Sequence, residues 1–408
     1  MDLVPLRRPA YRRLLGGYVV SLLGDQIYFL ALPWAALQET GSAAVAALLL
    51  TTSAVPRAVL MLAGGVLVDR FGSRRVMLAS DILRTVVMIA AAAAAFGGVG
   101  IVGLFVVAAV FGTVEAFFNP AINTVAITLV DREELPAANG LRSLAVRMSQ
   151  SVGPLLGGVV VAAGSIGWVF LINAVTFAVS VLAIWRLPVD APTGEAAPTG
   201  SERRFWKEIG AGLAHAARHP RLRPLLAISL LITFGFAGPT NVGLPLLAFQ
   251  QEWGAGGLGI LFGSLGVGAT LGALLVSFGL LPHAGTGRLL LVASAVQAVC
   301  AAVTPFVLWL PVEVAVQAVL GFAAMVAGNS ALTLVQSEAD GAMRGRTMSL
   351  MSLSMVGLAP LAYAGGGLIA SAFGLTTMFL IGALIQAVAV LIGVTSAALR
   401  AATVESSA

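Results

Sequence analysis

The sequence contains very little charge for its length. Asp, Glu, Lys and Arg make up 10% of its 408 residues, whereas hydrophobic residues make up 59%. The mean hydropathy is accordingly high, at +0.98. A water-soluble fold of this size has too little interior to hide so much apolar surface. We therefore expect a membrane protein.

Cysteine and histidine are nearly absent. The single cysteine, Cys300, falls in an apolar segment, which excludes a disulfide framework and a cysteine metal site. His215, His219 and His283 fall in hydrophilic loops, which excludes a set of histidine ligands inside a membrane. No apolar segment brings a nucleophile together with a base. The sequence therefore predicts neither an enzyme, nor a bound metal, nor a cofactor.

What the sequence has instead is about a dozen apolar segments of roughly 20 residues, each long enough to cross a bilayer as a helix. The first follows a basic leader and is too long for a cleavable signal peptide, so we interpret it as a membrane span. The predicted spans begin near Leu14, Ala43, Val76, Val99, Gly140, Ser165, Leu222, Gly256, Gly287, Pro311, Gly345 and Leu375.

Basic residues are missing from every second loop. Of 23 lysines and arginines, all but Arg57, Arg84 and Arg147 fall in loops or ends on the side shared by both termini. This asymmetry places both termini in the cytoplasm. In a soluble protein the pI of about 10.1 would suggest nucleic acid, but here anionic lipid headgroups account for it. The asymmetry of basic residues, together with a strong Arg and Ala bias, predicts a multi-pass protein of the bacterial cytoplasmic membrane.

The chain looks duplicated around one long hydrophilic interruption. We expect a six-helix bundle at residues 1–187, a linker with an amphipathic helix at 188–221, and a second six-helix bundle at 222–408. Leu32-Pro33 matches Leu244-Pro245, and Pro154-Leu155 matches Pro360-Leu361, at offsets of 206 to 212. Parallel six-helix halves are an architecture of transporters that hold substrate near the membrane midplane.

The loop after the second span carries the first family resemblance. The sequence GGVLVDRFGSRRVML resembles the signature loop of the major facilitator superfamily, with Ser73 at the family's first basic position. The matching residues are Gly65, Asp69, Arg70, Gly72, Arg74 and Arg75. Gly72 permits a tight reversal, and Asp69 is placed to meet the positive end of another helix. The resemblance implies that this contact latches the cytoplasmic side shut; the alternative is an ordinary charged loop.

The fifth span carries a second resemblance, to the motif of drug–proton antiporters in the same superfamily. The matching residues are Gly140, Gly153, Pro154, Gly157 and Gly158, while Ser149 replaces a middle glycine. Pro154 should bend the helix, and the glycines should let a neighbour pack against the bend. Segments such as SLLGDQIYFLALPW and EAFFNPA also resemble the macrolide and siderophore exporter branch. The arginine that many of the antiporters carry in span 4 is absent.

Three charges lie deep in predicted spans, where a charge costs several kcal/mol. Asp25 and Arg57 each lie 12 residues from a cytoplasmic edge, or roughly 18 Å deep, so we expect them to pair. Glu115 lies at comparable depth without an obvious partner. We expect Asp25, with Arg57 and Glu115, to couple transport to protons. The alternatives are that Asp25 and Arg57 only fix helix packing and that Glu115 is a structural acid. Asp81 and Arg84 read as a local pair near the interface.

Amides and aromatic residues in the spans are candidates for a substrate cavity. Amide side chains are unfavourable in lipid and should face partners or water. The candidates are Asn119, Phe117, Asn241, Phe234, Asn329 and Met325. Such aromatic residues more often face lipid or the bundle core.

The sequence therefore predicts an all-α membrane protein with 12 transmembrane helices in two pseudo-symmetric six-helix bundles, the major facilitator fold. The resemblance implies proton-coupled efflux of a small amphipathic compound or drug by alternating access, by a monomer without nucleic-acid partners. The alternative is a dedicated exporter or flippase of one metabolite, siderophore or lysolipid. A membrane-embedded enzyme or a sensor is disfavoured, because no catalytic constellation or soluble output domain is present.

Overall fold

The structure is a computed structural model of the chain, and it describes residues 4–98, 100–187, 219, 222–278, 280, 285–338 and 357–396. Within these ranges, helices are the only regular secondary structure. Eleven of them are long and apolar enough to cross a membrane. The predicted all-helical membrane fold is therefore confirmed. The eleventh predicted span begins near Gly345, outside the described residues, and its end is the shorter helix α14 (Ala359–Phe373).

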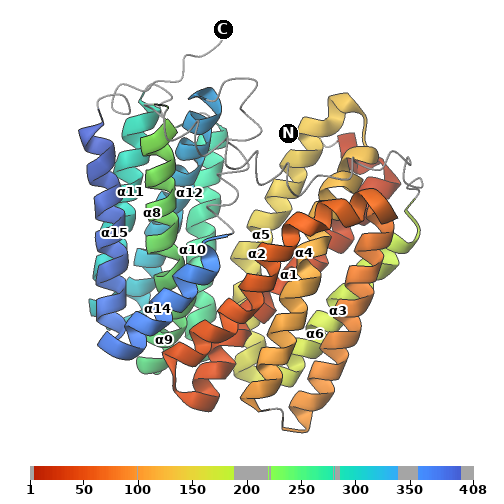
Figure 1. The fold of residues 1–408 in the computed structure, drawn as a ribbon, viewed down its shortest axis with the longest axis horizontal. Coiled ribbons are helices and arrows are strands. Elements are labelled where there is room, and N and C mark those ends of the chain that lie inside the picture. Colours follow the sequence, from red (N-terminus) through yellow and green to blue (C-terminus); the bar gives the residue numbers. More distant parts are fainter. Residues whose placement is uncertain are drawn as a thin grey trace. The chain divides into compact units, whose positions relative to one another are not determined.

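The helices pack as two compact units (Figure 1). The first holds α1 (Pro9–Thr40), α2 (Ala43–Phe71), α3 (Ser73–Phe96), α4 (Ile101–Thr128), α5 (Leu135–Ala163) and α6 (Ile166–Trp185), together with residues Glu252–Gly263. Short 3-10 helices at Val4–Arg7 and Arg132–Glu134 precede α1 and α5.

The second unit begins with α8 (Leu222–Gly238), which continues through a π-helical segment at Pro239–Gly243 into α9 (Leu244–Gln250). It also contains the later part of α10 (Gly254–Ser277), α11 (Thr286–Val303), a 3-10 turn at Thr304–Phe306, α12 (Leu310–Glu338), α14 and α15 (Leu375–Thr395). Most of the predicted linker at 188–221, including its amphipathic helix, lies outside the described residues.

Glycine shapes two of the helix reversals in the first unit. Gly41 ends α1 in the left-handed region with φ of 65°, and the Ser42 side chain then accepts a hydrogen bond from the Val45 amide at the start of α2. Gly72 has φ of 84° between α2 and α3. Residues with a Cβ rarely adopt such values. The expectation that Gly72 permits a tight reversal is therefore confirmed.

The closest helix contacts recur in both units. α2 packs mainly on α4, and a Cβ on Gly112 of α4 would lie 1.9 Å from the Ser53 carbonyl oxygen of α2. In the second unit, a Cβ on Gly321 of α12 would lie 1.9 Å from the Leu265 carbonyl oxygen of α10. These two contacts are related by sequence offsets of 209 and 212, which agree with the offsets of the sequence repeat. The duplication thus extends to backbone packing.

Candidate functional site

Arg84 on α3 organises a buried cluster of charges in the first unit. Its side chain is 1% exposed, and its Nη2 lies 2.5 Å from the Asp81 Oδ1 one turn earlier. Its guanidinium stacks between the rings of Phe118 on α4 and Phe177 on α6, with 4.4 Å to each ring centroid. The expected local pair of Asp81 and Arg84 does form, and both residues are buried in the first unit, while its place near the membrane interface stays a prediction.

Asp25 on α1 faces the same arginine from farther away. Its Oδ2 lies 4.0 Å from Arg84 Nη1, and its buried Oδ1 has no hydrogen-bond partner. Asp81, in contrast, has a second partner, because the Ser180 hydroxyl on α6 donates to its Oδ2 at 2.6 Å. Both oxygens of the Asp81 carboxylate therefore have close hydrogen-bond partners, whereas within the described residues Asp25 has only the 4.0 Å contact with Arg84.

Arg57 on α2 pairs with Glu115 on α4. Its Nη1 lies 3.2 Å from one Glu115 carboxylate oxygen and 3.4 Å from the other. Among the described residues, no salt bridge joins Asp25 to Arg57, so the expected pairing was wrong. The reason is helix packing: α2 packs mainly on α4, and on α1 the Arg57 guanidinium lies over the Phe29 ring, 5.9 Å from its centroid, instead of beside Asp25. Equal depth on consecutive helices did not identify the partner.

The cluster holds more acids than bases. Three carboxyl groups, of Asp25, Asp81 and Glu115, face two guanidinium groups, of Arg57 and Arg84. Arg147 is the remaining arginine within a span, and in the described chain it makes no salt bridge to these carboxyls. A buried charge without a partner is expensive, so one of the three acids should hold a proton. Asp25 is the one with the fewest favourable contacts.

Glycines of the antiporter-like motif bring α5 against the part of α1 that follows Asp25. A Cβ on Gly153 would lie 2.4 Å from the Gln26 Cβ, and one on Gly157 would lie 3.2 Å from the Ile27 Cα. Pro154 lies inside α5 and is buried. The motif therefore places a glycine-lined surface directly beside the segment that carries Asp25. Gly158 is also buried, and Gly140 is half-buried near the start of α5.

The signature loop lies at the ends of α2, α3 and α6. Asp69, Arg70 and Arg75 are exposed, and Arg74 donates a hydrogen bond to the Trp185 carbonyl at the end of α6. Gly65 lies in α2, but its surroundings are outside the described part of the chain. The Asp69 carboxylate is thus exposed at the end of α2, and its role as a latch stays a prediction.

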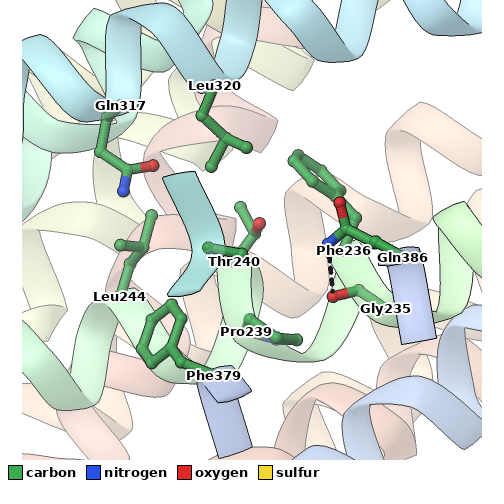
Figure 2. Close-up of a pocket in the computed structure, with 10 residues that line it drawn as sticks. Gly235, Phe236, Pro239, Thr240, Leu244, Gln317, Leu320, Phe379 and Gln386 are labelled. Atoms are coloured by element: carbon green, nitrogen blue, oxygen red, sulfur yellow. Dashed lines mark hydrogen bonds between the residues drawn. The ribbon is translucent and has the colours of Figure 1, made fainter. Parts of the chain in front are cut away.

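The π-helical segment of the second unit follows from a proline. Pro239 has no N–H to donate to the carbonyl four residues earlier, which belongs to Gly235. The Gln386 side chain on α15 supplies the missing donor, with its Nε2 3.1 Å from that oxygen (Figure 2). The Asn241 side chain likewise donates to the Ala237 carbonyl at 3.0 Å. Two side-chain amides therefore donate hydrogen bonds to backbone carbonyl groups in the turn that the proline has widened.

The six residues proposed to line a substrate cavity differ in how far their side chains are buried. Asn119 and Phe117 are half-buried on α4, as are Phe234 on α8, Asn241 in the π-helical segment and Asn329 on α12. Met325 on α12 is buried, and Phe117 packs on the core of the first unit. A role in substrate binding remains a prediction for all six.

Sequence reasoning missed one buried acid. Glu313 lies in the first turn of α12 and is 0% exposed, whereas the deep charges predicted from the sequence all lie in the first half of the chain. The available signal was an acid three residues into a predicted span. It was overlooked because an acid so close to a loop is normally solvated.

Comparison with known proteins gives the family. The family model described as Major Facilitator Superfamily matches residues 14–363. The multidrug efflux pump Tap of Mycolicibacterium fortuitum is 28% identical over 370 residues, which cover 88% of each chain. The enterobactin exporter EntS of Citrobacter koseri is 26% identical over 365 residues, covering 85% of this chain and 82% of that protein.

Solved structures agree on the fold. A bacterial homologue of the iron transporter ferroportin in an inward-facing state matches with a TM-score of 0.73 and 18% identity, covering 97% of this chain and 99% of that one. The nucleoside transporter NupG matches with a TM-score of 0.74 and 16% identity, covering 95% and 98%. At these identities the likeness shows the fold and nothing about substrate.

Proposed function

This chain belongs to the Major Facilitator Superfamily, and from that membership we propose that it exports a small amphipathic compound from the bacterial cytoplasm in exchange for protons. The direction is supported by the relatives, a multidrug efflux pump and an enterobactin exporter. It is also supported by the glycines of α5 that pack beside Asp25. Both termini then lie in the cytoplasm, as the distribution of basic residues predicts.

The observation that carries the proposal is the excess of one acid in the buried cluster. With Asp81 bound to Arg84 and Glu115 bound to Arg57, Asp25 is left to hold the proton. Its Oδ2 is still only 4.0 Å from Arg84, so an ionised Asp25 would compete with Asp81 for the same guanidinium. Protonation therefore changes how α1 and α3 attract each other, which is what a coupled carrier needs.

The driving force is sufficient for export. Each proton that enters down the membrane potential contributes about 2.3 kcal/mol per 100 mV. For an uncharged substrate, one proton per cycle thus supports a concentration ratio of roughly 50 at that potential, because about 1.4 kcal/mol corresponds to a factor of ten. We propose that Asp25 takes this proton from outside and releases it to the cytoplasm.

A transport screen tests the proposal. The full-length protein is reconstituted in liposomes and offered a panel of amphipathic cations, macrolides and catecholate siderophores, with and without an imposed pH gradient. Accumulation of one or more compounds only with the gradient is expected. Accumulation that ignores the gradient would contradict proton coupling.

The enterobactin exporters among the relatives favour a second candidate, a dedicated exporter of one metabolite. The same panel separates the two candidates. Several chemically unrelated substrates support a drug pump, whereas gradient-driven transport of a single compound class supports the dedicated exporter.

A further inference from the structure

The second unit contains a buried carboxyl group that the mechanism above does not use. Glu313 is 0% exposed, and its Oε1 accepts a hydrogen bond from the Gln317 Nε2 at 2.7 Å. Its Oε2 is buried and has no hydrogen-bond partner. The nearby Thr304 hydroxyl donates its hydrogen bond to the Cys300 carbonyl at 3.0 Å instead of to the Glu313 carboxyl group. A single amide donor is poor compensation for a buried carboxylate.

No cation compensates for Glu313 in the described part of the second unit. The basic residues described there are His219, Arg223 and Arg288. Arg288 lies at the start of α11, whereas Thr304, beside Glu313, follows its end, so about 24 Å of helix separates them. Cys300 on α11 is the titratable side chain that faces the carboxyl group.

Besides the hydrogen bond from Gln317, one further effect favours the charged form, namely the positive end of α12, because Glu313 lies in its first turn. This effect is weak compared with the cost of burying a carboxylate without a counter-charge. The balance therefore favours the neutral acid. Glu313 should hold a proton while the helices around it are packed as described.

Gln317 also lines a small cavity whose walls are mainly apolar but include three polar side chains. The cavity has a volume of about 10 Å³, which is close to what one water molecule needs. Gln317, Thr240 and Gln386 line it together with apolar residues (Figure 2). The side-chain oxygens of Gln317 and Gln386 are buried without hydrogen-bond partners, so each can accept a hydrogen bond from water.

We propose that Glu313 is a second proton-binding site of this transporter, held as a neutral acid beside a hydrated cavity at the outer end of the second unit. The distribution of basic residues predicts that Arg288, at the start of α11, lies on the cytoplasmic side. Because α12 begins on the opposite side of the membrane, Glu313 in its first turn lies near the outer side. In each exchange, the O–H bond of the acid breaks, its proton passes to water, and a proton from water restores it. A role in transport rests on the proposed function, but the protonation itself does not.

Infrared spectroscopy tests the proposal without any substrate. The full-length protein in phosphatidylcholine liposomes is compared with Glu313→Gln at neutral pH, where the C=O stretch of a protonated acid is separate from carboxylate bands. The matched control is Glu252→Gln, because Glu252 is an exposed acid that follows α9 on the same side. The difference spectrum should contain one protonated acid for Glu313→Gln and none for Glu252→Gln. The band should shift in D₂O as the proton exchanges.

A second variant keeps the test decisive if Glu313→Gln does not fold. Glu313→Asp retains the acid, so its C=O band should move in frequency instead of disappearing. Absence of any protonated-acid band that responds to either variant would overturn the proposal. So would a band that never shifts in D₂O, because such an acid would be sealed in the structure. Loss of transport in every variant would leave these spectra unchanged, so failure of the proposed function is distinguishable from failure of the proton site.

Discussion

Arg84 shows what a single residue does in this fold. Its positive charge is fully desolvated and is compensated by Asp81, by two aromatic rings and, at longer range, by Asp25. Each compensation comes from a different place in the sequence. Removing the arginine therefore strands a buried carboxylate, whereas removing both charges leaves only a change in packing.

At this scale we predict that Arg84→Leu lowers the stability by about 3–5 kcal/mol, because Asp81 loses its counter-charge. Adding Asp81→Asn should recover part of the loss, since the two residues act as a unit. Unfolding of the detergent-solubilised variants, followed by circular dichroism, measures this. Arg75→Leu is the control, because Arg75 is exposed on the same helix, and it should resemble the wild type. A double variant no more stable than Arg84→Leu would refute the pairing.

The sequence identified the three deep charges but not their partners. Asp25, Arg57 and Glu115 stood out because charge is rare in apolar segments. Hydropathy gives the depth of a residue in the membrane, but it does not say which helix faces which. The pairing of Arg57 with Glu115 depends on the contact of α2 with α4, which joins elements that are not consecutive.

At the scale of elements, the widened turn in the seventh span shows how a proline is accommodated. Pro239 leaves the Gly235 carbonyl without its usual donor, and Gln386 on α15 replaces that donor. The span itself was predictable from its hydropathy. The π-helical turn was not, because a proline in a span predicts a distortion but not which side chain repairs it.

We therefore predict that Gln386→Met destabilises the protein by about 1–3 kcal/mol, the cost of leaving a buried carbonyl unpaired. In a Pro239→Ala background the same substitution should cost less, because the introduced alanine restores a backbone N–H that can reach the Gly235 oxygen. Chemical unfolding of the four variants gives this double-mutant cycle. Equal costs in both backgrounds would show that Gln386 acts through packing instead.

At the scale of the whole molecule, the sequence predicted two parallel halves, and the recurrence of the Gly112 and Gly321 contacts agrees with that repeat. Within the residues that the structure describes, however, the ionic cluster belongs to the first unit, and the second unit contributes the buried acid Glu313. The halves have thus kept their helix packing while their polar chemistry has diverged. Repeat detection could reveal the first of these features but not the second.

We predict that Asp69→Asn shifts the conformational balance and lowers transport several-fold with nearly normal expression. Its carboxylate is exposed at the end of α2, where we expect it to meet the positive end of another helix, and an amide would weaken that attraction. Accessibility of single cysteines on each membrane face, in a Cys300→Ser background, measures the shift. Glu133→Gln is the control, because Glu133 is another exposed acid of the first unit. Unaltered accessibility with full transport would contradict the latch.

The most direct test of proton-coupled export is gradient-driven accumulation by Asp25→Asn, using a compound that the wild type transports. Asparagine keeps the shape of the side chain but cannot titrate. We predict that the variant exchanges the compound across liposomes without a gradient but no longer accumulates it when a pH gradient is imposed. Glu133→Gln, which removes an exposed acid outside the cluster, should still accumulate it. Undiminished accumulation by Asp25→Asn would contradict the account and move the coupling role to Glu115 or elsewhere.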